Sequence, residues 1–257
     1  MRAVGARPYT VIFSTATVDG RIASSTGYSM LSCSYDLTRL RLLRGAAEAV
    51  MVGASTVLLD NPSLRKRLEP RSDRYYRVVV DGRLRIHEDL RLLREPGPPV
   101  IVFTATRDPE KIRRLESRGA RVHLVGDDGV IDLGEAMRIL VTVYGVRRLL
   151  VEGGGVLNYS MLREGLVDEL RVTYTPYVFA AGRSVVDDPE ARGFATTSES
   201  PRLRLVCMEK CPCGNCVHAA YRVESTCCPP ASGPYIEPCL SQKLRGLTTR
   251  AEQLYEW

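Results

Sequence analysis

A carboxylate and three consecutive glycines, residues 152–155, follow directly on a short apolar run at residues 149–151. The apolar run predicts a buried strand, and the apolar spacing after the glycines predicts a helix. A strand, a glycine turn and a helix N-terminus in this order present backbone N–H groups to an anion. Glycine also lets a ligand approach the main chain closely. On these residues alone, the alternative is a tight strand-to-helix turn that carries a surface carboxylate.

The composition is that of an ordinary globular chain of 257 residues, with 44% hydrophobic and 26% charged residues. The net charge is +6, but the arginines are scattered among acidic residues rather than gathered in a stripe. This distribution argues against a nucleic-acid partner and suits a small anionic substrate. No apolar run reaches the length of a membrane span, and the N-terminus lacks the apolar core of a secretory signal. We therefore expect a cytoplasmic protein with no membrane partner.

Strand and helix patterns alternate along the first 165 residues, with helices predicted over 34–44, 109–118 and 133–144. Residues 167–174 then alternate like a strand with one solvated face, and 202–206 and 217–223 predict two more strands. This order predicts the α/β class: a mostly parallel sheet with helices on both faces and an antiparallel C-terminal edge. We expect one domain over residues 1–223, followed by a Cys/Pro-rich extension over 224–257.

Five stretches identify a known family by their order and spacing: residues 15–23, 52–62, 79–84, 151–157 and 164–170. With them the chain resembles the 2,5-diamino-6-ribosylamino-4(3H)-pyrimidinone 5′-phosphate reductases of riboflavin biosynthesis, in the archaeal and fungal single-domain form. The resemblance covers roughly residues 8–223 and implies a dihydrofolate-reductase-like fold and a homodimer. It also implies that the substrate is a phosphorylated pyrimidine, whose ribosylamino C1′ accepts hydride in the ring-opened imine form and becomes ribitylamino.

The implied hydride source is NADPH, with NADH as the alternative. By resemblance, one set of residues would hold this cofactor: Thr56, Asp60, Asp81, Gly82, Arg83, Gly153, Gly154, Gly155 and Val156. The glycines would hold the pyrophosphate. The family often has Ser-Lys where this chain has Gly82-Arg83, but a guanidinium can bind the 2′-phosphate bidentately. Without the resemblance, Thr56 and Asp60 would be read as residues that cap a helical turn.

The resemblance places four residues against the substrate, namely Arg44, Leu64, Arg67 and Glu152. On composition alone, the two arginines would be solvated surface. An aromatic residue that bacterial relatives carry before the first helix is Met30 here, which puts a stacking contact in doubt. For catalysis, Glu152 or Asp60 would deliver a proton through water, and a substrate-borne group or bulk water is the alternative source.

Seven of the eight cysteines lie between residues 207 and 239. Cys211, Cys213, Cys216 and His218 have the residue types of a structural zinc site, and Cys207, Cys227, Cys228 and Cys239 are alternative ligands. Disulfides and free thiols are the competing interpretations. The Pro-Cys-Gly-Asn-Cys run matches half of a zinc deaminase signature, but no histidine is followed by glutamate two residues later, which excludes deaminase activity.

Two other functions remain open at this point. One is a dihydrofolate-reductase-like oxidoreductase that acts on another substrate, for which Arg44 and Arg67 would have no phosphate to bind. The other is a non-enzymatic nucleotide-binding protein whose cysteine-rich tail binds a metal. Oxidation of NADPH in the presence of the ribosylamino-pyrimidine phosphate would distinguish the riboflavin-pathway reductase from both of these alternatives.

Overall fold

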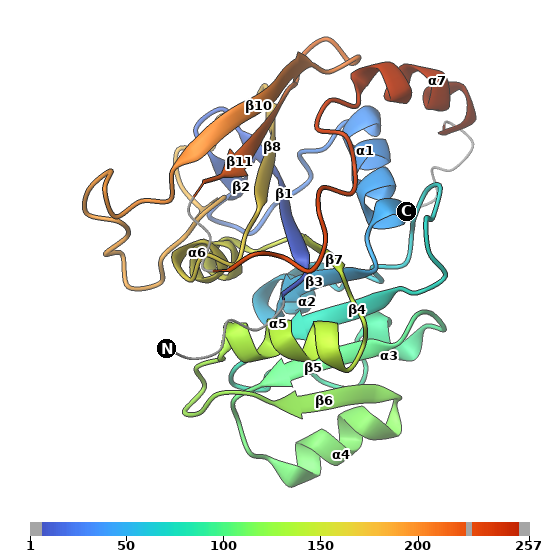
Figure 1. The fold of residues 1–257 in the computed structure, drawn as a ribbon, viewed down its shortest axis with the longest axis vertical. Coiled ribbons are helices and arrows are strands. Elements are labelled where there is room, and N and C mark those ends of the chain that lie inside the picture. Colours follow the sequence, from blue (N-terminus) through green and yellow to red (C-terminus); the bar gives the residue numbers. More distant parts are fainter. Residues whose placement is uncertain (1–6, 225–227, 252–257) are drawn as a thin grey trace.

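A nine-stranded sheet forms the centre of the computed structural model, which describes residues 7–224 and 228–251 (Figure 1). The strand order is β10-β11-β8-β1-β7-β3-β4-β5-β6, and two short strands, β2 and β9, pair separately. The strands are β1 (Tyr9–Thr17), β2 (Arg21–Ala23), β3 (Ala49–Gly53), β4 (Tyr76–Val80), β5 (Val100–Thr104), β6 (Ala120–Leu124), β7 (Arg148–Val151), β8 (Glu169–Thr175), β9 (Arg183–Ser184), β10 (Leu203–Lys210) and β11 (Val217–Val223).

Every neighbouring pair from β8 to β6 is parallel. At the C-terminal edge of this sheet, β11 is antiparallel to β8, and β10 is antiparallel to β11. The helices are α1 (Ser34–Ala46), α2 (Ala54–Asp60), α3 (Arg91–Arg94), α4 (Pro109–Ser117), α5 (Leu133–Thr142), α6 (Gly155–Arg163) and α7 (Ser241–Ala251). The predicted fold class, a mostly parallel sheet with an antiparallel C-terminal edge, is confirmed. Among the residues that the structure describes, no helix is both long and apolar enough to cross a membrane.

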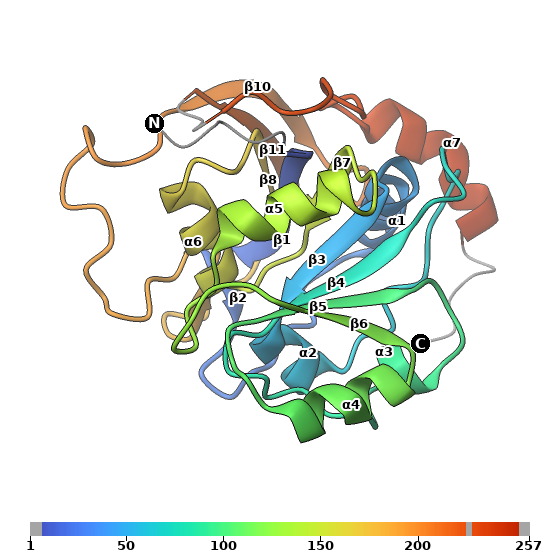
Figure 2. The same ribbon diagram turned by 60° about the horizontal axis from the view of Figure 1, so that its bottom comes forward.

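The helices divide between the two faces of the sheet (Figure 2). One core packs α5 and α6 against side chains such as Met51 and Phe103. The other core packs α1, α2, α3 and α4 against the alternate side chains, such as Val50 and Val102. Since neighbouring positions in a strand face opposite ways, both faces of the central strands are apolar, as a buried parallel sheet requires.

Strand β8 differs from its prediction, which gave it one solvated face. It lies parallel to β1 and is buried at every position except the half-buried Tyr174. Its polar side chains bond to other buried groups instead of water: Arg171 pairs with Glu169 at 2.6 Å and donates to the carbonyls of Ile236 and Glu237. The polar residues Glu169 and Arg171 therefore belong to a buried hydrogen-bonded layer beneath residues 236–237, and not to a solvated face.

The described part of the C-terminal extension, residues 228–251, packs on the domain; Cys227 lies outside the described residues. The Tyr235 hydroxyl is buried and donates to the Leu149 carbonyl at 2.9 Å. Leu240 and Leu244 pack on Leu42 of α1, beside which α7 lies in Figures 1 and 2.

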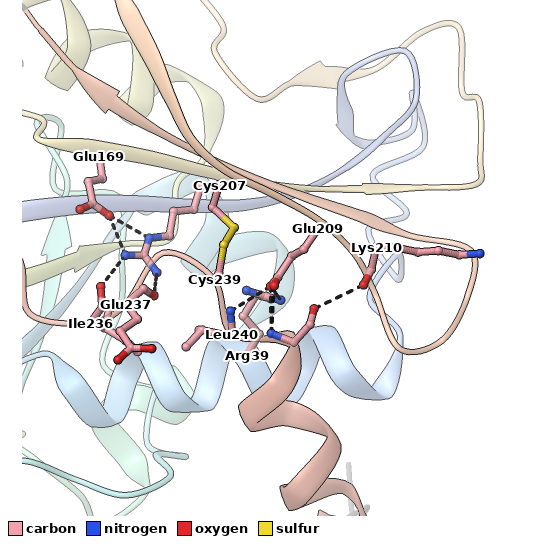
Figure 3. The surroundings of a disulfide bond; sticks show 11 residues. Arg39, Glu169, Cys207, Glu209, Lys210, Ile236, Glu237, Cys239 and Leu240 are labelled. Atoms are coloured by element: carbon pink, nitrogen blue, oxygen red, sulfur yellow. Dashed lines mark hydrogen bonds and ion pairs between the residues drawn. A yellow bond between two sulfur atoms is a disulfide. The ribbon is translucent and has the colours of Figure 1, made fainter.

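A disulfide joins β10 to the extension through Cys207 and Cys239 (Figure 3). Next to it, the Glu209 carboxylate accepts hydrogen bonds from Arg39 at 2.6 Å and from the backbone N–H groups of Leu240 and Ser241. The carboxylate thus satisfies N–H groups just before and at the start of α7 and also neutralises a buried guanidinium. Apolar packing, hydrogen bonds and a covalent link all hold the extension to α1 and β10.

Candidate active site

A pocket of about 650 Å³ opens at the carboxyl ends of β3, β4 and β7, where open α/β sheets place their ligands. Its walls come from the loop before α1, from α2, from the loop around Gly129, from the N-terminal end of α6 and from β9. The volume is typical of small-molecule and cofactor sites. Several predicted site residues line it: Arg44, Thr56, Asp60, Leu64, Gly82, Glu152, Gly154, Gly155 and Val156.

Glu152 and Arg44 form a bidentate ion pair inside this pocket. Arg44 lies in the last turn of α1, and its Nε and Nη2 donate to the two Glu152 carboxylate oxygens at 2.6 and 2.7 Å. Both side chains are nearly buried, at 12% and 11% exposure. Burial lowers the pKa of Arg44, but the charge of Glu152 and its hydrogen bonds outweigh burial and hold that pKa above its usual range. Because Arg44 donates to both oxygens, it fixes the position of the Glu152 carboxylate.

The glycine turn fits closely against its neighbours. Gly153 has a φ of +89°, which disfavours other residues, and its carbonyl accepts from the Gly53 N–H at 2.8 Å. At Gly155, a Cβ would lie 2.3 Å from the Ser184 carbonyl oxygen. The N-cap residue of α6, Gly154, offers no side-chain cap, so the first N–H groups of the helix are not satisfied by one. The predicted order of strand, glycine turn and helix is present, and anion binding at this turn stays a prediction.

Thr56 and Asp60 lie on α2 and line the same pocket as this turn. Gly154 approaches Thr56 so closely that a Cβ there would lie 3.3 Å from the Thr56 hydroxyl. Ser29 donates a hydrogen bond of 3.4 Å to Asp60. Burial against the pocket walls raises the pKa of Asp60, and the Ser29 hydrogen bond opposes that rise. Burial therefore favours the protonated form of Asp60.

Asp81, Arg83 and Gly153 do not line the pocket. The Asp81 side chain turns inward, is 1% exposed and accepts from the Ile86 N–H at 2.8 Å, so that it closes the turn after β4. Arg83 is exposed, and its side chain lies against Gly129. Gly82 reaches the pocket, where a Cβ would meet the Gly129 carbonyl oxygen at 2.0 Å.

Arg85 lines the pocket and was not predicted from the sequence. Its guanidinium donates to the Ser55 hydroxyl at 3.2 Å and lies 3.6 Å from Asp81. The side chain therefore projects toward α2, next to Thr56. The family resemblance pointed to Arg83, because that residue follows Val80, Asp81 and Gly82 in the matching stretch. The turn that Asp81 closes instead brings Arg85 back to the pocket.

Arg67 lies outside the pocket lining, although Leu64 belongs to it. The Arg67 guanidinium sits 4.4 Å from the centre of the Tyr75 ring and donates to the Ser72 carbonyl at 3.1 Å. Tyr75 in turn donates to the Leu64 carbonyl at 3.2 Å. In this structure Arg67 supports the residues behind the pocket wall, and its predicted contact with substrate stays a prediction.

The four metal ligands suggested by sequence are not brought together as a set. His218 extends away from the thiols: its Nδ1 contacts the Thr173 hydroxyl at 2.7 Å and lies 4.0 Å from Asp36. Burial lowers the pKa of His218 to about 3, so the ring is neutral at physiological pH. The sulfur atoms of Cys211 and Cys213 instead lie with that of Cys33, all within 4.8 Å of one another.

The chain is thus an α/β protein with a mostly parallel sheet and a pocket at the carboxyl ends of its strands, where such sheets place their ligands. The model of the RibD C-terminal domain family matches residues 8–217, so the chain belongs to that family. The predicted family resemblance is thereby confirmed.

Two relatives carry the same name, 2,5-diamino-6-ribosylamino-4(3H)-pyrimidinone 5′-phosphate reductase. The one from Methanothermobacter thermautotrophicus is 39% identical over 202 residues, 77% of this chain and 91% of the relative. The one from Archaeoglobus fulgidus is 36% identical over 187 residues, 69% of this chain and 84% of the relative. The solved Acinetobacter baumannii RibD structure is similar with a TM-score of 0.70 at 22% identity, over 84% of this chain and 58% of that one. This similarity shows that the two chains share a fold.

Proposed function

We propose that this protein is the NADPH-dependent reductase of 2,5-diamino-6-ribosylamino-4(3H)-pyrimidinone 5′-phosphate in riboflavin biosynthesis, of the archaeal type that its relatives represent. The observation that carries the proposal is a single pocket that joins the glycine turn to the Arg44–Glu152 pair. A dinucleotide on the glycines and a pyrimidine phosphate beside Arg44 would meet there. The bound dinucleotide supplies a hydride for C1′ of the ring-opened substrate.

The pocket fits such a dinucleotide at two places. At the first, the uncapped N-terminus of α6 offers N–H groups for a pyrophosphate. At the second, Arg85 reaches into the pocket beside Ser55, where a guanidinium is suited to bind a 2′-phosphate. Arg83, one turn away and exposed, is the alternative partner for that phosphate. We infer that Arg85 carries most of the preference for NADPH over NADH.

The carboxylates in the pocket take different roles. Glu152 is fixed by Arg44 through both of its oxygens, so it orients polar groups of the substrate. Asp60, whose pKa is raised by burial, holds the proton that the nitrogen side of the reduced imine requires, directly or through a water molecule. Leu64 supplies an apolar wall for the pyrimidine.

The decisive test is NADPH oxidation by the purified protein with and without the ribosylamino-pyrimidine phosphate. We expect oxidation only with this substrate, and formation of the ribitylamino product. Glu152→Ala should abolish most of that activity. Failure of the pyrimidine phosphate to stimulate NADPH oxidation would contradict the proposed function, whereas full activity of Glu152→Ala would contradict only the site assignment.

The cofactor preference is tested separately. Losing a charge-assisted hydrogen-bond pair to a phosphate costs about 1.5–3 kcal/mol, or roughly tenfold or more in affinity. Arg85→Ala should therefore raise KM for NADPH by that factor and leave KM for NADH nearly unchanged. Arg83→Ala is the matched control. If Arg83→Ala shows the selective effect and Arg85→Ala does not, the 2′-phosphate binds at the position that the sequence predicted.

We also propose that the protein acts as a homodimer. The edge strand β10 supports this, because three of its apolar side chains, Leu203, Leu205 and Met208, are exposed at 39%, 49% and 68%. An exposed edge strand with apolar residues is a surface on which a second chain can pair. The cysteine cluster takes no part in the proposed reaction.

A further inference from the structure

Three cysteines, Cys33, Cys211 and Cys213, gather where the loop before α1 meets the turn between β10 and β11, and a fourth, Cys216, lies on that turn. The Sγ atoms of Cys33 and Cys211 are 3.7 Å apart, and those of Cys33, Cys211 and Cys213 all lie within 4.8 Å of one another. Cys216 is buried on the same turn, and its carbonyl accepts a hydrogen bond from the N–H of Cys211. None of the four takes part in the disulfide, which joins Cys207 to Cys239.

The separation of the sulfur atoms suits ligands of one metal ion. A zinc–thiolate bond is about 2.3 Å long in a tetrahedral site, which puts neighbouring sulfur atoms about 3.8 Å apart. The 3.7 Å between Cys33 and Cys211 agrees with this edge length, whereas a disulfide would require about 2.05 Å. Cys211 and Cys216 are buried, at 2% and 4% exposure, and Cys33 and Cys213 are half-buried.

The turn that carries three of the thiols is built to converge them. The Cys211 N–H donates to the Cys216 carbonyl at 2.8 Å, which closes the turn at its base. Gly214, with a φ of +89°, donates to the Cys211 carbonyl at 2.9 Å and reverses the chain between Cys213 and Cys216. The turn therefore brings the thiols of Cys211 and Cys213 to one side, where Cys33 faces them from another part of the chain, and it places Cys216 at its base.

The surroundings also suit a cluster of thiolates around a cation. Arg39 is buried, at 3% exposure, and lies close enough to Cys211 for their charges to interact. Its Nε has no hydrogen-bond partner within the part of the chain that the structure describes, although Nη2 is paired with Glu209. A positive group beside the cluster would offset the net negative charge of four thiolates around a divalent ion.

We propose that Cys33, Cys211, Cys213 and Cys216 bind one zinc ion. Binding replaces the four thiol protons, which are released to solvent, by four sulfur–zinc bonds, and no oxidation or reduction takes place. Zinc is the metal that such closed tetrathiolate sites most often hold in structural positions. The site is independent of the proposed reductase function.

The location of Cys33 gives the ion a structural role toward the pocket. Cys33 is the N-cap residue of α1 and follows Ser32, which lines the pocket and donates to Thr15 at 3.2 Å. The C-terminal turn of the same helix carries Arg44. Zinc would tie the pocket wall and the start of α1 to the turn between β10 and β11.

The test is metal analysis of the full-length protein, purified without chelator from cells grown with added zinc. We expect about one zinc ion per chain in the wild-type protein and in two controls, His218→Gln and Cys228→Ser. Cys33→Ser and Cys211→Ser should lose most of the metal. Absence of bound metal from the wild-type protein would overturn the proposal. So would retention by Cys33→Ser together with loss by His218→Gln, which would restore the ligand set suggested by sequence.

Because a cysteine variant can fail to fold, a second measurement uses the wild-type protein alone. X-ray absorption at the zinc edge should show four sulfur neighbours at about 2.3 Å. Three sulfur neighbours and one nitrogen neighbour would contradict the set proposed here. Titration of the native protein with a thiol-specific mercurial should release zinc in step with the cluster thiols, and release of no zinc as these thiols react would overturn the proposal.

Discussion

At the scale of single residues, Arg44 and Glu152 are both largely removed from water and are stabilised by two short hydrogen bonds to each other. Breaking a buried pair by removing one partner costs about 3–5 kcal/mol, because it leaves the other charge unpaired. Glu152→Ala should therefore lower the free energy of unfolding by about 3 kcal/mol as well as remove activity. Urea unfolding followed by circular dichroism measures the change.

A matched pair of variants separates stability from catalysis at this site. Arg44→Met combined with Glu152→Ala should destabilise the protein by less than the sum of the single changes, with a coupling energy of about 0.5–3 kcal/mol. Activity, in contrast, should remain absent from the double variant. If the stability changes simply add, the two side chains do not form this ion pair in solution.

His218 sets a pH dependence of stability. Its pKa is about 3 in the folded protein and about 6.5 in an unfolded chain, so between these values the unfolded state binds more protons. Stability is then fully present above pH 6.5 and falls as pH decreases, by at most about 1.4 kcal/mol per pH unit from this group. The groups that face the ring are Asp36 and Arg39 on α1, Thr173 on β8 and Glu209 on β10.

Burial raises the pKa of Asp36 and opposes this trend, so the informative quantity is the difference between two proteins. His218→Gln should show a shallower decline of the unfolding free energy between pH 6.5 and 4 than the wild-type protein. Equal slopes in urea denaturation at matched pH values would show that His218 is charged in the fold or that its ring is solvated.

At the scale of elements, the turn between β7 and α6 depends on Gly155. A methyl group there would lie 2.3 Å from the Ser184 carbonyl oxygen and 2.8 Å from Asp187 Cβ, so the segment that includes β9 would have to move. Gly155→Ala should weaken NADPH binding at least tenfold and lower stability by about 1–3 kcal/mol. Gly233→Ala, whose Cβ would meet nothing within 4 Å, is the control. Fluorescence titration with NADPH that gives the same Kd for both variants would contradict this role.

Many of the helix bounds and turns could be predicted from the residues next to them in sequence. The helices α4 and α5 lie close to their predicted ranges because the glycines that follow them, Gly119 and Gly145, mark where each ends. The glycine turn after β7 was also predictable, because strand, glycines and apolar helix are adjacent in sequence. Strand β8 was predicted as a strand, but its burial on both faces was not, because the burial of Glu169 and Arg171 depends on a segment that returns more than 60 residues later.

The candidate site divides in the same way. Glu152, Thr56 and the glycines lie in contiguous stretches whose pattern identifies them. Cys33 could not be assigned, since its thiol partner lies 178 residues away and nothing around Cys33 distinguishes it from a small buried residue. His218 was included because it is close in sequence to the thiols, but the alternation of β11 turns it to Thr173 instead.

At the scale of the whole molecule, an irregularity in β10 between Leu205 and Cys207 decides what each face of the C-terminal edge does. A bulge shifts every later side chain to the opposite face. Cys207 is therefore buried toward the extension and bonds to Cys239, instead of sharing the exposed face with Leu203 and Leu205. Met208 joins those leucines on the exposed face. One face of β10 thus bonds to the C-terminal extension, and its other face is apolar and exposed.

That apolar surface predicts how two copies would associate. Leu205→Lys places a charge among Leu203, Met208 and Val217, all of which are exposed, and a buried unpaired charge opposes association. Light scattering after gel filtration should give a dimer for the wild-type protein and a monomer for Leu205→Lys. Val143→Lys, at a position that is 63% exposed beyond the end of α5, should remain dimeric. A wild-type monomer would contradict the proposed assembly, and a dimeric Leu205→Lys would place its interface elsewhere. Because Leu205 lies outside the pocket, loss of activity in the monomer would mean that the pocket needs the partner for its shape.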